Sequence, residues 1–95
     1  MKEASMTIKL PERFDFSYHK DFYNHTADIL AKSSLKEVQM DFSQVEYLDS
    51  SALGMLVMLQ KKCAEVNKRV VVINVSGVAA EILQIANMDK LVDIR

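Results

Sequence analysis

The sequence predicts a small α/β domain with a mixed, mostly parallel β-sheet. Along the chain, segments with the two-residue alternation of β-strands alternate with segments that have the spacing of helices. Strands connected through helices in this way are usually parallel neighbours in one sheet. The chain has 95 residues, 49% of them hydrophobic, with only 2 glycines and 1 proline, which is typical of one compact core. We therefore expect one domain over residues 1–95.

Four segments have the character of strands. Residues 6–10 alternate apolar and polar side chains and end at Pro11, which indicates an edge strand. Residues 38–42 alternate in the same way. Residues 69–75 are β-branched on both faces, which is typical of a central strand covered by helices on one or both sides. Residues 91–94 are expected to form a short last strand.

Three helices are expected between these strands, over residues 17–32, 50–66 and 76–87. The first has apolar and aromatic side chains at helical spacing, and Ser17 is its candidate N-cap. The second begins at a pair of serines, and the third begins at a Ser-Gly pair.

Composition and charge exclude several classes of protein. The formal net charge is −1 and the basic residues are scattered, so no clustered positive face for nucleic acid is expected. No apolar run approaches the roughly 20 residues of a membrane span, so we expect no direct membrane contact. No signal-peptide pattern opens the chain, and Cys63 is the only cysteine. These features favour a cytoplasmic protein.

The start of the second helix carries three consecutive polar residues, Asp49, Ser50 and Ser51. Aspartate and serine are preferred N-caps because their side-chain oxygens accept hydrogen bonds from the free N–H groups of the first turn. The same N–H groups and the helix dipole also favour a phosphate at this position. The two interpretations, a helix cap and a phosphorylation site, are compatible.

The second helix has a core stripe and an outer face. Its apolar stripe consists of Ala52, Leu56, Leu59, Cys63 and Val66. Met58 falls on the opposite side, about one turn beyond Gly54. A flexible thioether on an outer face, next to a glycine that leaves the backbone bare, is common at protein contacts. We expect Gly54 and Met58 to contact a partner.

The stretch "YLDSSALGMLVML" resembles the signature of the STAS domains of anti-sigma factor antagonists, in which a strand ends in Asp-Ser-Ser/Thr-x-Leu-Gly and a helix follows. The order of elements also fits from Met6 to about Arg95. In that family an anti-sigma factor that is also a serine kinase phosphorylates the serine after the aspartate, and a PP2C-type phosphatase removes the phosphate. The resemblance implies that Ser50 is the acceptor, with Asp49 shaping the site and Ser51 helping to cap the helix.

The resemblance implies a second acidic residue near the acceptor, in the loop before the first helix. The segment "RFDFS" offers Asp15 for this position, although the surrounding family pattern is only loosely kept. Two further departures are a short N-terminal strand region and the lack of the family's final helix. Part of one sheet face or the third helix would then be less covered, so a partner or a second copy, forming a homodimer, is expected to supply that cover.

Catalysis and metal binding are weakly indicated. No G-x-S-x-G elbow is present, and His19 and His25 are six residues apart on one helix, so they do not share a face. We expect His25 to pack and His19 to face solvent. Cys63 lies on the core stripe, where a thiol is usually a small hydrophobe. No nucleotide-binding glycine loop is present. The prediction is therefore a protein that is not an enzyme, without cofactor or metal.

The function predicted from these features is that of a phosphorylation-switched anti-sigma factor antagonist. Its unphosphorylated form binds an anti-sigma factor serine kinase and so frees a sigma factor, and phosphorylation of Ser50 ends the complex. One alternative is a STAS subunit of another signalling assembly or of a lipid-transport complex, used without phosphorylation. A small serine-dependent enzyme is the third alternative.

Overall fold

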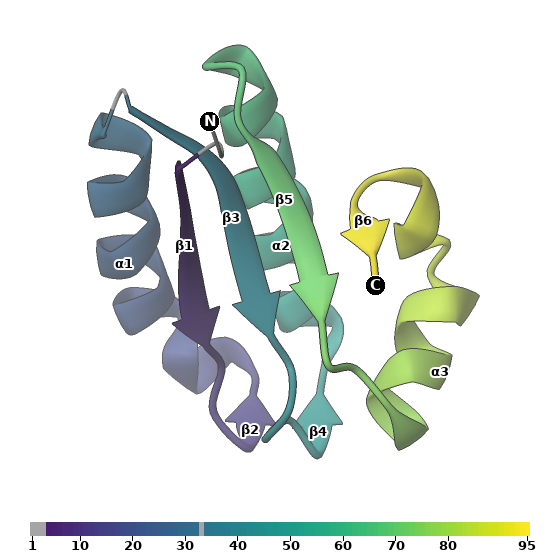
Figure 1. Cartoon of the computed structure of the whole chain (residues 1–95). Helices are drawn as coiled ribbons and strands as arrows, with labels where there is room; N and C mark the ends of the chain where they lie inside the picture. Colours follow the sequence, from purple (N-terminus) through teal and green to yellow (C-terminus); the bar gives the residue numbers. More distant parts are fainter. Residues whose placement is uncertain (1–3, 33) are drawn as a thin grey trace.

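The computed structural model describes residues 4–32 and 34–95 as a four-stranded sheet with helices (Figure 1). The order of strands in this sheet is β1-β3-β5-β6, and a separate two-stranded sheet pairs β2 with β4. The strands are β1 (Ala4–Lys9), β2 (Arg13–Phe14), β3 (Leu35–Asp41), β4 (Tyr47–Leu48), β5 (Arg69–Ile73) and β6 (Asp93–Ile94). The helices are η1 (Phe16–Tyr18), α1 (His19–Ala31), α2 (Ser50–Glu65), α3 (Gly77–Ile85) and η2 (Met88–Lys90).

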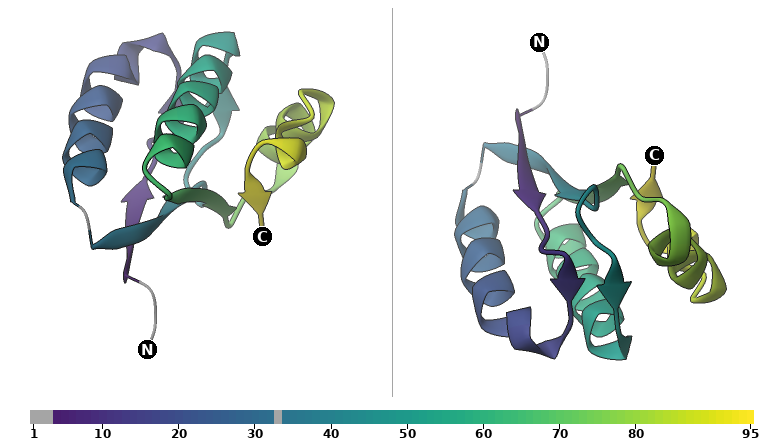
Figure 2. Two further views of the ribbon diagram at one scale, coloured as in Figure 1. Left: turned by 90° about the horizontal axis from the view of Figure 1, so that it is seen from above. Right: turned by 90° about the horizontal axis from the view of Figure 1, so that it is seen from below.

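The predicted small α/β class with a mostly parallel sheet is confirmed, but the described residues form no antiparallel pair, so the sheet is not mixed. Helices alternate with strands, and the four strand pairs of the described residues are all parallel. Strand β1 lies at one edge and β5 lies inside the sheet, as their sequence patterns indicate. Figure 2 shows α1 and α2 side by side over one face of the sheet, with α3 beside the β6 edge.

The hydrophobic core lies between the sheet and these helices. Strands β3 and β5 direct alternate residues toward it, and Val38, Met40, Val70 and Val72 are at most 3% exposed. Because Val38 pairs with Val70 and Met40 with Val72, these four side chains form one continuous apolar surface under α1 and α2.

The opposite face of the sheet is largely polar, although Val71 on this face is fully buried. Glu37 on β3 lies at its centre, where its carboxylate accepts from Gln39 Nε2 (2.9 Å) and Arg69 Nε (3.2 Å) and lies 3.6 Å from Arg95. These interactions lower the pKa of Glu37, the hydrogen bond from Gln39 most, and burial opposes them. A charged residue on β3 is therefore held within a cross-strand network that spans β3, β5 and the chain after β6.

The first helix begins differently from the prediction. Ser17 is not its N-cap, because Asp15 caps the preceding η1 by accepting from Ser17 N, and α1 begins at His19. The predicted packing of His25 is also wrong, since His25 is exposed while Thr26 is buried. Thr26 and His25 flank the stripe of Phe22 and Ile29 on opposite sides, Thr26 toward α2 and His25 toward the edge strand β1, where less covers it.

The second helix confirms most of the predicted core stripe. Ala52, Leu56, Leu59 and Cys63 are at most 2% exposed, but Val66 is 43% exposed because the helix ends at Glu65. Left-handed residues stop three of the elements: Asn67 follows α2, Asn74 follows β5 and Asn87 follows α3, with φ of 60°, 59° and 58°. Asparagine tolerates this conformation better than most residues.

Candidate functional site

The site is built where the short strands β2 and β4 end. They pair in parallel, Phe14 with Leu48, so their carboxyl ends meet at the same edge, where the start of η1 and the start of α2 lie close to each other (Figure 1). Each strand is followed directly by an aspartate, Asp15 after β2 and Asp49 after β4. Adjacent parallel strands lie about 4.8 Å apart, so two carboxylates leave the sheet from neighbouring positions.

Asp49 is the N-cap of α2. Its backbone is extended and its Oδ1 accepts from Ala52 N at 2.9 Å. The cap is therefore supplied by the aspartate rather than by Ser51, which was expected to help. Ser50 is the first residue of the helix and is exposed, while Ser51 is half-buried. The Ser50 hydroxyl thus stands on a helix N-terminus, open to solvent.

Asp15 is fixed by three neighbouring groups. It accepts from the Ser17 hydroxyl, from Ser17 N at 3.0 Å and from Arg13 Nε at 2.8 Å. The Ser17 hydroxyl and the Arg13 guanidinium lower the pKa of Asp15, the serine more strongly, with burial acting against them. Arg13 also stacks over the ring of Tyr47 at 4.6 Å, which ties β2 to β4 from the side. The carboxylate stays ionised and held in place near the start of α2.

A groove of about 440 Å³ runs between α1 and α2 from this edge. Its walls are mostly apolar and are formed by residues of η1, α1 and α2, among them Phe16, Tyr23, Ser51, Gly54, Met58 and Lys62. Met58 is 44% exposed, and nothing lies within 4 Å of a Cβ placed on Gly54. The two residues expected on the outer face therefore line the same groove as Ser51.

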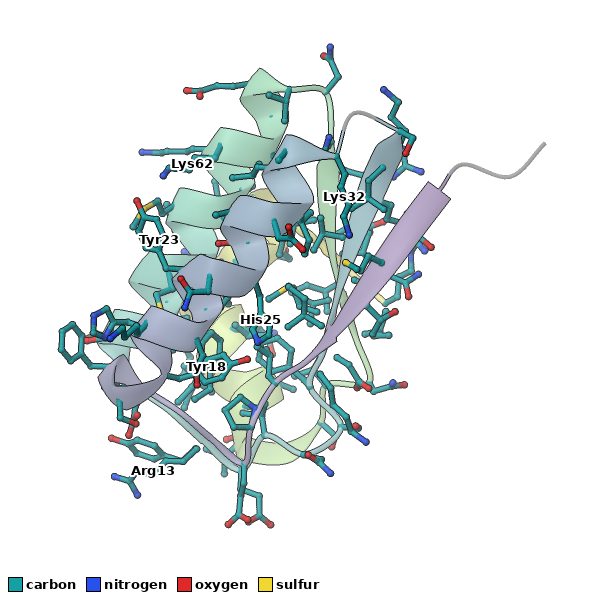
Figure 3. All side chains as sticks on the ribbon, turned by 90° about the vertical axis from the view of Figure 1, so that its left-hand side faces the viewer. Arg13, Tyr18, Tyr23, His25, Lys32 and Lys62 are labelled. Carbon is teal, nitrogen blue, oxygen red and sulfur yellow. The ribbon has the colours of Figure 1, made fainter. Side chains whose placement is uncertain are left out.

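The far end of the groove carries a polar pair. Lys62 Nζ donates to Tyr23 Oη at 3.3 Å and lies 5.0 Å from the centre of the Tyr23 ring. Figure 3 shows the two labelled side chains meeting between the helices, Tyr23 from α1 and Lys62 from α2. The two residues are 39 positions apart in the sequence, and no sequence pattern marks either of them as part of a site.

Sequence reasoning located Asp49, Ser50, Ser51, Gly54 and Met58 on one element, which the structure keeps together. It missed Arg13, Tyr47, Phe16, Tyr23 and Lys62, which complete the edge and the groove. One signal was available: Phe14-Asp15-Phe16-Ser17 and Leu48-Asp49-Ser50-Ser51 share the pattern of an apolar residue, an aspartate and a serine two positions later. This pattern marks both capped helix starts.

Of the remaining candidates, His19 also lines the groove, whereas His25 and Cys63 do not. His19 Nδ1 lies 2.8 Å from the Phe16 carbonyl oxygen and its ring stacks on Phe16, while His25 points away toward β1. Within residues 4–32 and 34–95, no group of His, Cys, Asp and Glu side chains is arranged to hold a metal ion. Cys63 is buried, and burial raises the pKa of its thiol. No helix in the described part of the chain has the length and apolarity to cross a membrane.

The class defined by these features is a small parallel α/β domain with an exposed serine at a helix start and an aspartate after each of two neighbouring strands. The family model described as Mlab, STAS domain matches residues 1–93. A STAS-domain containing protein of Pseudomonas aeruginosa, PA14_20770, is 34% identical over 89 residues, which cover 94% of this chain and 86% of that protein. The chain therefore belongs to the STAS-domain family.

Solved structures agree with this assignment at the level of the fold. A candidate anti-sigma factor antagonist from Thermotoga maritima, tm1081, has a TM-score of 0.82 at 20% identity, covering 95% of this chain and 77% of its own. The Bacillus anti-sigma factor antagonist SpoIIAA has a TM-score of 0.74 at 14% identity in its unphosphorylated form, covering 100% of this chain and 82% of its own. The phosphorylated form of SpoIIAA gives the same TM-score.

Proposed function

We propose that this protein is a partner-switching STAS domain whose switch is phosphorylation of Ser50. The unmodified form docks on an anti-sigma factor serine kinase through the exposed start of α2, with Gly54 and Met58 in contact, and so frees a sigma factor in the cytoplasm. The kinase then transfers a phosphate to Ser50 and the complex dissociates. A PP2C-type phosphatase restores the unmodified form.

The observation that carries this proposal is that Ser50 is exposed at the start of α2 while Asp49, and not Ser50, caps the helix. Asp49 already satisfies Ala52 N, so modifying Ser50 removes no cap from α2. The free N–H groups of the first turn and the positive end of the helix dipole stabilise a phosphate there. The fold is therefore expected to survive phosphorylation.

The same phosphate would change the surface sharply. It adds about −1.5 to −2 charges at pH 7, next to Asp49 and near the ionised Asp15. A partner surface shaped for a neutral hydroxyl is then repelled by a local cluster of negative charge. The switch acts on a surface and leaves the core unchanged.

The test uses the kinase partner purified from the host and titration calorimetry. We expect Ser50→Ala to bind constitutively, and Ser50→Asp to bind at least about tenfold more weakly, equivalent to about 1.4 kcal/mol. Protein phosphorylated enzymatically on Ser50 should behave as Ser50→Asp does, while Ser51→Ala should still accept phosphate. Equal affinity of the two folded Ser50 variants would contradict the switch.

A second candidate function is favoured by the family model, whose description names the Mlab group of STAS domains. In this alternative the domain is a subunit of another assembly, such as a lipid-transport complex, and Ser50 is never modified. Mass spectrometry of the protein from its host, sampled across growth states, distinguishes the two functions. A phosphate on Ser50 supports the switch, and its absence in every state supports the subunit.

A further inference from the structure

We propose that the groove between α1 and α2 receives an amphipathic helix of a binding partner, with an acidic residue in the first turn of that helix facing Lys62. This inference rests on the proposed function in one respect only: the helix belongs to the kinase partner.

The rim of the groove is unusually apolar for a surface. Phe16 is 61%, Tyr23 54% and Met58 44% exposed, and all three line the groove. Aromatic residues and methionine are enriched at protein interfaces, and clustered exposed apolar side chains are uncommon on monomers. A small ligand is the poorer occupant, because such ligands have 70–90% of their surface buried, whereas this rim stands open to solvent.

The length of the groove fits a short helix. Along α2 its walls extend from Ser51 to Lys62, a separation of about 16 Å, or three turns, at 1.5 Å per residue. Two helices side by side leave a trough along their axes, and a third helix fills it with apolar residues spaced i, i+3 or i+4, and i+7. Gly54 lies along this trough with open space at its Cβ position, so another backbone can approach closely.

Charge fixes the direction of the incoming helix. Lys62 lies in the last turn of α2, and its Nζ donates to Tyr23 Oη while keeping further N–H groups for an acceptor. An acidic residue is most favourable in the first turn of its own helix, because of the helix dipole. The partner helix therefore runs antiparallel to α2, and its carbonyl end, with partial negative charge, lies near Ser50. A phosphate on Ser50 would repel that end.

The experiment uses two designed 14-residue helical peptides with identical leucine faces, one with glutamate and one with lysine in the first turn. Binding to the ¹⁵N-labelled full chain is followed by NMR. We expect chemical-shift changes along the groove, at Tyr23, Gly54 and Met58, and about fivefold tighter binding of the glutamate peptide. Lys62→Glu should reverse the preference, while Lys61→Glu, an exposed neighbour outside the groove, should leave it in place.

Several outcomes would overturn the proposal: no binding at millimolar peptide, shifts along β1 instead, or an unchanged preference in a folded Lys62→Glu variant. Displacement of the peptide by a lower concentration of decanoate would identify a site for small amphiphiles and reject the helix. Phosphorylation of Ser50 is measured separately. If Ser50 is never modified but the peptide preference reverses as expected, the switch fails and the helix-binding groove stands.

Discussion

Asp49 combines two properties that substitution can separate, its hydrogen bond to Ala52 N and its charge. Asparagine caps a helix about as well as aspartate does, whereas alanine leaves the N–H group unsatisfied. We expect Asp49→Asn to keep the stability of the fold and Asp49→Ala to lower it by about 1 kcal/mol, measured by urea denaturation.

The phosphorylation rates of these two variants test whether the charge matters. If Asp49 helps to position the hydroxyl or a kinase-bound Mg²⁺, Asp49→Asn should be a poor substrate despite its normal stability. Asp15→Asn should behave similarly if the neighbouring carboxylate takes part. Normal phosphorylation of both folded variants would restrict Asp49 to capping.

The reactivity of Cys63 is set by its burial in the fold and not by the candidate site. It is fully buried on α2 beneath the sheet, and burial raises the pKa of its thiol. The thiolate is the reactive form, so we expect native protein to react with a disulfide reagent far more slowly than urea-unfolded protein. Similar labelling rates in the two states would show that α2 opens readily.

At the scale of elements, α2 has a buried face and an exposed face, proposed for binding, that substitutions should distinguish. Leu56→Ala removes a fully buried side chain and should destabilise the protein by about 2–5 kcal/mol. Met58→Glu alters an exposed position and should change the stability by only about 0.5 kcal/mol. Calorimetric melting temperatures would show the difference, and equal losses would contradict the assignment of the two faces.

The sequence predicted the longer elements well because their periodicity extends over enough residues to be read. The stripe of α2 from Ala52 to Cys63 is an example. Strand β2 was missed, and β4 was implied only by the family resemblance, because strands of two residues have no periodicity to detect. Their pairing alone brings Asp15 beside Asp49, so the position of Asp15 rested on family resemblance. Tyr23 and Lys62 meet through tertiary packing, which no local pattern encodes.

At the scale of the whole molecule, Glu37 on the polar face of the sheet makes the stability of the fold depend on pH. The folded pKa of Glu37 lies below its ordinary value of 4.5, so its contribution to stability is complete above that value and is lost as pH falls through the folded pKa. We expect Glu37→Gln to be less stable than the natural protein near pH 7 and the gap to shrink below about pH 4.

Urea denaturation at a series of pH values measures this gap. Glu65→Gln, at an exposed position, is the matched control and should show no comparable dependence. A constant gap between Glu37→Gln and the natural protein across pH 3–7 would mean that the network does not favour the ionised carboxylate.

The parallel topology also determines how the chain can fold. Met6 pairs with Val38, Val38 with Val70 and Val71 with Asp93. The two strands of each pair in the main sheet are therefore separated in the sequence by a complete helix. No hairpin can form early in this sheet, and loop closure must precede strand pairing. During synthesis the sheet therefore cannot be completed until its last strand emerges, and until then the helices have only part of their apolar support.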